Sequence, residues 1–387
     1  MTDLVILTTH AIQYQAPLFQ YLVKEAGINL FVVFLEPPAV DKPYWDNDFN
    51  TFIQWDIPLV EGYKWSVLPP GNLGQRLCSF FTLHARCGRP PIMLTSWSTP
   101  LHWAIWTWAI LSCVPILVGA ETNRESYALG RRPIWRHQWL RYLIQHTDAL
   151  LYIGQRNRDF YLWLGATSSH LFSYPYSVDN KRFAETQERI LKQRNERLST
   201  LGLDPTLPTL LFCGKLIPKK RPDLLLSAVY EGKLTQDFNI LFVGDGQLRN
   251  QLVAKVATLN LPRVGFMGFL NQSEMPIAYA LGDILCLLSD TPAETWGLVV
   301  NEALACGRPV IVSDCCGCVP DLVKGEGTGW VVPPGDLVKT TNTLKTAVNL
   351  LQSWCEMGEE GRAVIAKHTF AKMAEGVITA LNSIHAL

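Results

Sequence analysis

Apolar and polar residues alternate along the chain in blocks of two kinds. Short apolar runs predict buried strands, and longer segments with helical spacing separate them. In the first half the runs lie at 4–8, 29–35, 92–96, 114–119, 149–153 and 170–173. In the second half they lie at 209–213, 240–243, 264–267, 284–288, 310–312 and 329–332. This alternation predicts an α/β fold with two Rossmann-like domains, each built on a parallel sheet.

A polar segment at 185–206, rich in Arg, Lys, Glu and Gln, separates the two sets of strands. We therefore predict a first domain at 1–190 and a second at 200–369. The segment 101–120 is almost wholly apolar and has about the length of a membrane span, but Pro115 interrupts it. This pattern favours a buried helix followed by a buried strand, and a surface-seeking segment stays open as the alternative.

Glycines and charged residues follow several of the predicted strands in the second half. In doubly wound sheets, ligands bind beyond the carboxyl ends of the strands. We therefore expect the segments that follow these strands to share one rim of the second sheet. They are Gly214-Lys215, Gly244-Asp245-Gly246, Phe269-Leu270 and Glu294.

Glu302 is the only charged residue between Thr295 and Gly307. A carboxylate among apolar residues needs hydrogen-bond donors to offset the solvation that it loses. The flanking glycines predict a helix at 298–306, and Glu294 lies just before it. Free N–H groups at a helix N-terminus suit a phosphate, and carboxylates suit hydroxyl donors. The arrangement is typical of a site for a sugar nucleotide.

Glu294 and Glu302, which are separated by seven residues, belong to one of five sequence blocks that resemble glycosyltransferase family 4. The members of this family are retaining enzymes. The resemblance extends over about residues 170–375. It implies the GT-B fold, in which two Rossmann-like domains face each other across a cleft, and a last helix at 370–387 that packs back on the first domain. The blocks are 212–223, 243–246, 264–270, 294–310 and 327–336.

The resemblance also implies roles for individual residues. Glu302 would accept hydrogen bonds from the ribose hydroxyls, and Glu294 would accept them from hydroxyls of the transferred sugar. Lys215 and Lys220 would bind the diphosphate. Lysine stands at 215 where the family usually has arginine, which removes the planar guanidinium fork. The remaining donor-site positions are Gly214 beside the lysines, Phe269 and Leu270 near the base, and the backbone of Gly297, Leu298 and Val299 at the diphosphate.

The function that follows is hexosyl transfer from a UDP- or GDP-sugar to a glycan or lipid-linked acceptor, in surface polysaccharide biosynthesis. It needs no cofactor, no metal and no covalent nucleophile. The alternatives are a sugar-nucleotide epimerase on the same scaffold and a non-catalytic carbohydrate-binding protein. A dinucleotide oxidoreductase is disfavoured because Gly244-Asp245-Gly246 lacks the third glycine of that fingerprint.

The acceptor side is less distinct in the sequence. His10 and Gln13 follow the first strand, where the family commonly has a Gly-Gly loop. Glu121 follows a later strand, where many relatives place histidine, and a salt bridge to Arg124 is an equal alternative to a substrate contact. A lone histidine is more often structural than catalytic, so these residues are candidates only.

Composition narrows the picture further. Apolar residues make up 48% and charged residues 18% of the chain, and the net charge is zero, which disfavours nucleic-acid binding through bulk charge. Of ten cysteines, only those at 315–318 cluster, which favours a tight loop over a metal site.

Asp46-Asn47-Asp48 has the Asp-x-Asp form of metal-binding glycosyltransferases, but its surroundings indicate an ordinary loop. We expect a cytoplasmic protein, since the apolar run at 4–7 is too short for a signal peptide.

One segment has the composition of a membrane-surface helix. Residues 131–142 mix basic and aromatic side chains on a predicted helix, and such helices can lie on the inner surface of an anionic membrane. The favoured alternative is a helix whose tryptophans pack inward. Peripheral membrane contact would suit an enzyme that acts on a lipid-linked glycan.

Overall fold

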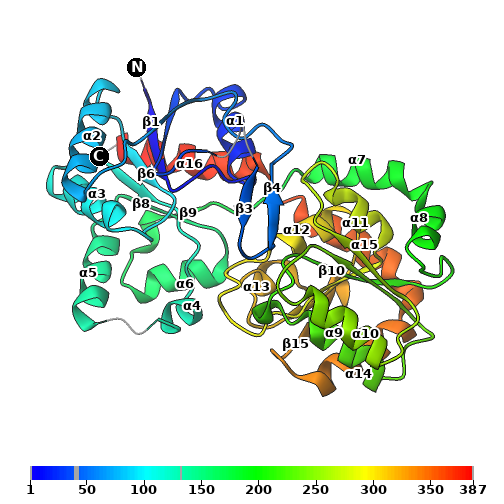
Figure 1. Cartoon of the computed structure of the whole chain (residues 1–387). Coiled ribbons are helices and arrows are strands. Elements are labelled where there is room, and N and C mark those ends of the chain that lie inside the picture. Colours follow the sequence, from blue (N-terminus) through cyan, green and yellow to red (C-terminus); the bar gives the residue numbers. More distant parts are fainter. Residues whose placement is uncertain (1, 39–42, 131–132, 386–387) are drawn as a thin grey trace. The chain divides into compact units, whose positions relative to one another are not determined.

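The structure, a computed structural model, describes residues 2–38, 43–130 and 133–385. The chain divides into two compact units (Figure 1). The first unit comprises Met1–Lys42, Ile57–Ser177 and His368–Leu387. The second comprises Pro43–Asp56 and Val178–Lys367.

The first unit contains a seven-stranded parallel sheet of order β5-β2-β1-β6-β7-β8-β9. Its strands are β1 (Leu4–Thr8), β2 (Leu30–Phe34), β5 (Lys64–Val67), β6 (Ile92–Leu94), β7 (Ile116–Val118), β8 (Ala149–Tyr152) and β9 (Leu171–Ser173). Its helices are α1 (Ala16–Lys24), α2 (Leu73–Arg86), α3 (Pro100–Leu111), α4 (Arg124–Ala128), α5 (Ile134–Gln145), α6 (Gln155–Trp163), η1 (Ser168–His170) and α16 (Phe370–His385).

The second unit contains a six-stranded parallel sheet of order β12-β11-β10-β13-β14-β15. Its strands are β10 (Thr209–Cys213), β11 (Asn239–Val243), β12 (Val264–Gly268), β13 (Ile284–Leu287), β14 (Val310–Ser313) and β15 (Gly329–Val332), and a separate antiparallel pair is formed by β3 (Tyr44–Asp46) and β4 (Thr51–Ile53). Its helices are α7 (Asn180–Leu191), α8 (Arg194–Thr200), η2 (Pro218–Lys220), α9 (Pro222–Glu231), α10 (Arg249–Thr258), α11 (Met275–Leu281), α12 (Leu298–Ala305), α13 (Val319–Leu322), η3 (Gly325–Gly327), α14 (Leu337–Asn349), η4 (Leu351–Ser353) and α15 (Trp354–Ile365).

Each sheet is covered by helices on both faces. In the second unit, α9, α10 and α14 lie on one face, and α11, α12 and α15 lie on the other (Figure 1). The order of the second sheet is that of a Rossmann fold, in which the chain runs outward in one direction from β10 and then in the other from β13. The gap between the carboxyl ends of these two strands is therefore the switch point where a ligand is expected.

All twelve strands predicted from apolar runs are present, with bounds that differ by at most two residues. Strands β3, β4 and β5 were not predicted from the apolar pattern. Strand β5 lies at the edge of its sheet with partly exposed side chains, and its Lys64 and Ser66 interrupt any apolar run. Strands β3 and β4 are three residues long and show no continuous apolar pattern.

The predicted boundaries of the domains need two corrections. The long middle segment of the first unit ends at Ser177 rather than at residue 190, because α7 packs against α11 and α12 of the second unit. The polar residues at the predicted boundary belong in part to α7, an amphipathic helix that buries Phe183 and Ile190. The second correction is that Pro43–Asp56 belongs to the second unit although its sequence lies between β2 and β5.

The last helix, α16, contacts α1, β8 and β9 of the first unit. It approaches so closely that a Cβ atom at Gly376 would lie 1.9 Å from the carbonyl oxygen of Ser173. The apolar segment at 101–120 forms the helix α3 and then the buried strand β7, as predicted. Among the described residues, no helix is both long enough and apolar enough to span a membrane.

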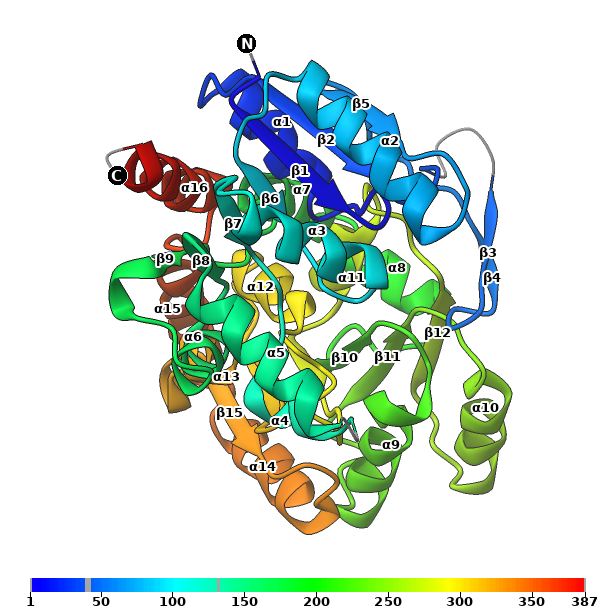
Figure 2. The ribbon, with the colours of Figure 1, turned by 90° about the vertical axis from the view of Figure 1, so that its left-hand side faces the viewer.

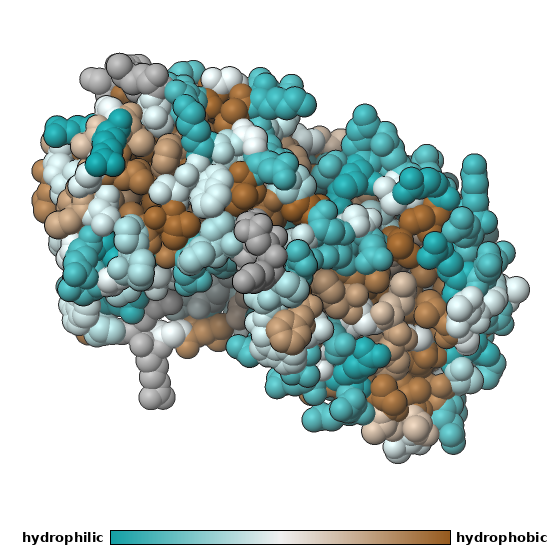
Figure 3. All heavy atoms as spheres, turned by 45° about the horizontal axis from the view of Figure 1, so that its top comes forward, coloured by the Kyte–Doolittle hydropathy of each residue, from teal (hydrophilic) through white to brown (hydrophobic). Residues whose placement is uncertain are grey.

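The surface of helix α5 contradicts the inward-packing interpretation of residues 131–142. Trp135 is 67% exposed and Trp139 is 38% exposed. Arg131 and Arg132 lie outside the described residues. On the face drawn in Figure 3, hydrophobic groups lie among hydrophilic ones, which is normal for a protein surface. Exposure alone therefore does not assign a function to the tryptophans of α5, and their neighbours on the surface must be considered.

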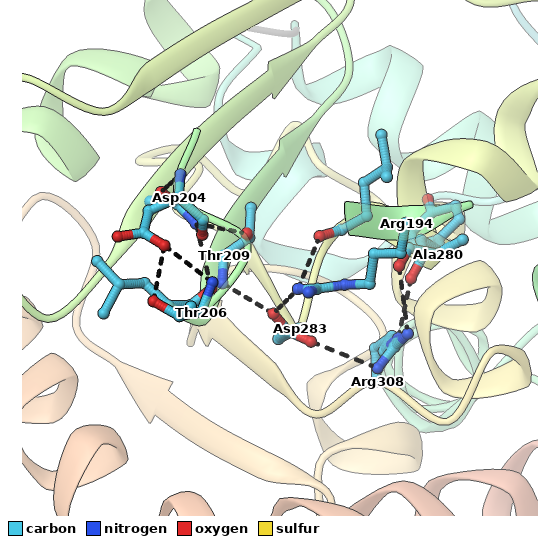
Figure 4. Close-up of polar contacts among 11 residues, drawn as sticks. Arg194, Asp204, Thr206, Thr209, Ala280, Asp283 and Arg308 are labelled. Carbon is cyan, nitrogen blue, oxygen red and sulfur yellow. Dashed lines mark hydrogen bonds and ion pairs between the residues drawn. The ribbon is translucent and has the colours of Figure 1, made fainter. Parts of the chain in front are cut away.

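A polar network centred on Asp283 connects β10, β13, α8 and the start of β14 in the second unit (Figure 4). Asp283 Oδ2 accepts hydrogen bonds from Arg194 Nη2 at 2.5 Å and from the backbone N–H of Thr209 at 2.8 Å. Arg308 Nη1 lies 3.6 Å from Asp283 Oδ1, and Arg308 Nε donates to the carbonyl of Tyr279 at 2.9 Å. One carboxylate therefore compensates two guanidinium groups that are largely removed from water.

We expect His102 to make the stability of the first unit depend on pH. The side chain is fully buried on α3, with its Nδ1 atom 2.7 Å from Thr99 Oγ1. Burial, with a smaller effect of the Arg76 charge, lowers the pKa of His102 to about 4. The unfolded chain keeps the ordinary pKa of about 6.5 and so binds more protons between these pH values.

We therefore expect the free energy of unfolding to have its full value above about pH 6.5. It should fall as the pH is lowered toward 4, by at most about 3 kcal/mol. Urea denaturation between pH 4 and 7 in the wild type and His102→Gln measures this dependence. The variant should have a flatter profile, whereas His146→Gln, at an exposed position, should keep the wild-type slope. Parallel profiles for the wild type and His102→Gln would contradict the assignment.

Candidate functional site

The loops predicted to share one rim follow four adjacent strands of the second sheet. Because β12, β11, β10 and β13 are parallel neighbours, the loops after them lie side by side at the carboxyl edge. Two of these loops touch through their glycines, since a Cβ atom at Gly244 would lie 2.0 Å from the carbonyl oxygen of Gly214. Both glycines have positive φ values, 121° and 137° respectively. Only glycine allows this approach without strain.

Lys220 and Glu294 meet at the switch point between β10 and β13. Their Nζ and Oε2 atoms are 2.8 Å apart, and the two side chains are 13% and 15% exposed. The hydroxyl of Ser289, just after β13, also donates to Glu294 Oε2 at 3.3 Å. The end of the lysine chain passes 3.7–3.8 Å from the position of a Cβ atom at Gly214. The structure thus brings together an amine and an acid that the sequence analysis had assigned to different parts of one ligand.

Lys215 has different partners. Its Nζ atom lies 2.9 Å from Asp48 Oδ2 and 3.3 Å from Asp46 Oδ1, both on the β3–β4 hairpin. The hydrogen bond from Lys215, together with its charge, lowers the pKa of Asp48. Asp46-Asn47-Asp48 was predicted from the sequence to be an ordinary loop. No local signal could have revealed these contacts, since the partners are 167 and 169 residues apart in the chain.

Helix α12 begins beside the Lys220–Glu294 pair. Gly297 precedes it with a φ value of 103°, and a Cβ atom there would lie 2.7 Å from Leu287 Cδ2. The backbone N–H groups of its first turn, which includes Leu298 and Val299, point out of the N-terminal end of the helix. This is the local arrangement that suits an anion.

Glu302 is fully buried on α12. The hydroxyl of Tyr279 donates to its Oε2 atom at 2.5 Å. Its burial shows that it is not a solvated surface carboxylate. With no exposed surface, the side chain would have to be uncovered before it could accept ribose hydroxyls, so that role stays a prediction.

The cysteine-rich segment forms a tight loop that fixes the backbone next to Glu294. The N–H groups of Gly317 and Cys318 donate to the carbonyls of Glu294 and Trp296, at 3.0 and 3.1 Å. A Cβ atom at Gly317 would lie 1.7 Å from the carbonyl oxygen of Thr295. The ten cysteines are free thiols, and no group of three or more metal-ligating side chains occurs among the described residues.

The acceptor-side candidates lie in the first unit. His10 is exposed, and its Nδ1 atom lies 3.1 Å from Thr9 Oγ1, while Gln13 is half-buried. Glu121 accepts a hydrogen bond from the hydroxyl of Tyr176. Burial and the charge of Glu121 raise the pKa of Tyr176 well above its ordinary value. Glu121 is thereby held against the segment that follows β9, and its role in binding an acceptor stays a prediction.

Comparison with protein families gives a match that lies within the second unit and covers most of it. Residues 193–363 match the family described as glycosyl transferases group 1. Among curated proteins, the chain is 29% identical over 265 residues to the sulfoquinovosyl transferase SQD2 of Arabidopsis thaliana, covering 66% of this chain and 49% of that protein. It is 31% identical over 256 residues to a GDP-mannose-dependent monoacylated alpha-(1-6)-phosphatidylinositol monomannoside mannosyltransferase of Corynebacterium glutamicum, covering 64% of this chain and 65% of that protein. The chain therefore spans about half to two thirds of these relatives.

Solved structures extend the likeness to the whole fold. The Anabaena protein HepE in complex with UDP superposes with a TM-score of 0.75 at 16% identity, covering 98% of this chain and 100% of that one. The sucrose-phosphate synthase of Thermosynechococcus elongatus superposes with a TM-score of 0.76 at 19% identity, covering 100% of both chains. These structures have the GT-B fold, so the predicted fold class of two Rossmann-like units with parallel sheets is confirmed.

Proposed function

We propose that this chain, whose residues 193–363 belong to the glycosyl transferases group 1 family, is a retaining glycosyltransferase of family 4. It moves a sugar from a UDP- or GDP-sugar to a glycan or lipid-linked acceptor in surface polysaccharide synthesis. The relatives support this class of donor, since the Corynebacterium protein is named as GDP-mannose-dependent and the Anabaena structure contains UDP. No step of the proposal uses a metal or a cofactor.

The observation that carries the proposal is the contact of Lys220 with Glu294 at the switch point of the second sheet. During transfer, the bond from the anomeric carbon to the donor phosphate breaks, and a bond to the acceptor oxygen forms on the same face. The acceptor proton passes to the leaving phosphate, as the family resemblance implies. Lys220 and the N-terminus of α12 would stabilise the charge that develops on the diphosphate. Glu294 would then accept hydroxyls of the sugar.

The proposal is tested with a panel of UDP- and GDP-sugars. Thermal shift identifies the donor, because a ligand that binds the folded state raises its melting temperature. Labelled donor and glycan or lipid-linked acceptors are then combined, and NMR determines the anomeric configuration of the product. We expect a product with the configuration of the donor. Release of an epimerised nucleotide sugar without transfer would indicate an epimerase, and binding without turnover would indicate a carbohydrate-binding protein.

For the acceptor, we propose peripheral contact with the inner surface of an anionic membrane. A groove of about 740 Å³ between α3 and α5 is lined largely by apolar side chains, which include the tryptophans Trp103, Trp108, Trp135 and Trp139. The Arg136 guanidinium carbon lies 5.3 Å from the Trp103 ring centroid. Neither helix contains Asp or Glu within its bounds. Exposed tryptophans next to arginine and away from acids suit the boundary between lipid head groups and acyl chains.

Cosedimentation with vesicles of phosphatidylglycerol and phosphatidylethanolamine tests this contact. Replacing Ile134 and Trp135 together by serine should lower the partition coefficient about tenfold or more, since each side chain contributes about 1 kcal/mol or more when it leaves water. Both positions are well exposed, so the fold should survive the change. Leu351→Ser, at an exposed position of the second unit, is the control and should bind like the wild type. Equal binding of the double variant and the control would contradict the proposal.

A further inference from the structure

The segment Pro43–Asp56, which contains the β3–β4 hairpin, is attached to the second unit at its C-terminal end. The carboxylate of Asp56 accepts hydrogen bonds from the backbone N–H and the hydroxyl of Ser273. The Asn271 side chain donates to the carbonyl of Gln54 at 2.5 Å and accepts from the backbone N–H of Asp56 at 3.3 Å. These contacts lie just after β12, within the part of the second unit that would face the base. The root of the hairpin is therefore fixed.

The middle of the hairpin covers two further loops of the candidate site. The Phe49 and Trp55 rings pack against Phe269, with centroid distances of 5.1 and 6.1 Å. The carbonyl oxygen of Asp48 comes so near to Gly246 that a Cβ atom there would lie 2.9 Å from it. Figure 2 shows the tip of this blue hairpin next to β12. The hairpin thus contacts the loops after β11 and β12 as well as Lys215 after β10.

The two aspartates at the tip differ in how firmly they are held. Asp46 accepts hydrogen bonds from the backbone N–H groups of Asp48 and Phe49, both at 2.9 Å, and its side chain is 18% exposed. Asp48 is 61% exposed and contacts Lys215 through one oxygen at 2.9 Å. The Lys215 ammonium also lies 5.0 Å from the Phe49 ring centroid. Asp46 is therefore part of the turn itself, whereas Asp48 can leave Lys215 without disturbing the turn.

We infer that the hairpin forms a fixed wall of the donor site, on which the Asp48 side chain competes with the donor diphosphate for Lys215. This inference rests on the proposed function. Two carboxylates and one ammonium group carry a net negative charge, which repels an incoming diphosphate. A diphosphate gains the full attraction of Lys215 only when Asp48 releases it. Asp48 acts here as a positioning residue, and Asp46 keeps the lysine attached to the hairpin.

The experiment measures the affinity of the full chain for UDP, GDP, uridine and guanosine by isothermal titration calorimetry. Asp48→Asn keeps the shape of the side chain and removes its charge. We expect it to bind the preferred diphosphate about two- to fivefold more tightly than the wild type, the range that exposed ion pairs typically give. The corresponding uncharged nucleoside should bind equally to both. Glu188→Gln removes an exposed carboxylate on α7 of the same unit and should change neither affinity.

Lys215→Met separates competition from a general effect of charge. In the Lys215→Met background, Asp48→Asn should no longer raise the affinity for the diphosphate, because the ammonium group for which both anions compete is absent. Unchanged or weaker diphosphate binding by Asp48→Asn, or a gain that persists without Lys215, would overturn the inference and leave the proposed function standing. Failure of the wild type to bind either diphosphate would overturn both.

Discussion

Replacing Lys220 by alanine is expected to lower kcat/KM for sugar transfer about 100- to 1000-fold, the loss typical when a preorganised group that stabilises developing charge is removed. The Lys220 side chain is 13% exposed and its ammonium nitrogen lies 2.8 Å from Glu294 Oε2, so little water is available to take its place. The rate is measured as label transferred from the donor identified in the panel. Lys220→Arg keeps the charge and should retain more activity than the alanine variant, although its different shape disturbs the contact.

Lys219 offers a matched control for Lys220. It lies in the same short helix, η2, and its side chain is exposed. Lys219→Ala should therefore stay within about twofold of the wild type, in line with the small effects of exposed charges. Melting curves of the variants separate a loss of activity from a loss of folding. A Lys220→Ala enzyme that folds and transfers sugar within a few-fold of the wild type would remove the observation on which the proposed function rests.

Replacing Asp283 by alanine is expected to lower the free energy of unfolding of the second unit by about 3–5 kcal/mol, as when one partner of a buried ion pair is removed. The change leaves Arg194 and Arg308, each with a side chain 16% exposed, without their shared carboxylate (Figure 4). Burial lowers the pKa of Arg308, which reflects the cost of keeping its charge away from water. The backbone N–H of Thr209 also loses its acceptor.

Urea denaturation followed by circular dichroism measures the effect of Asp283→Ala. Asp290→Ala is the matched control, because Asp290 is 36% exposed and lies 3.4 Å from Arg221 Nη1. Its loss should cost about 1 kcal/mol or less. If the two variants are destabilised equally, the network around Asp283 does not hold the second unit together in the way that its geometry indicates.

The fold was predictable where burial leaves a continuous pattern in the sequence. Strands at the centre of a parallel sheet are covered on both faces, so β1 and β10 consist almost entirely of apolar residues. Edge strand β5 has no such requirement, and its Lys64 and Trp65 are exposed. The polar helix α7 was assigned to the domain boundary because it buries only one narrow face. A local sequence pattern therefore predicts a strand reliably only when both of its faces are buried.

For the site, the sequence determined which loops share the carboxyl edge of the second sheet, because Gly214, Lys215 and Glu294 each follow a predicted strand of a parallel sheet. Only the tertiary structure decided the partners of each charge: Glu294 for Lys220, and the β3–β4 hairpin for Lys215. The physical reason is that a strand follows from local periodicity, whereas an ion pair depends on how distant segments pack. The partners of Lys215 lie 167 and 169 residues away in the chain, and such pairing leaves no local trace.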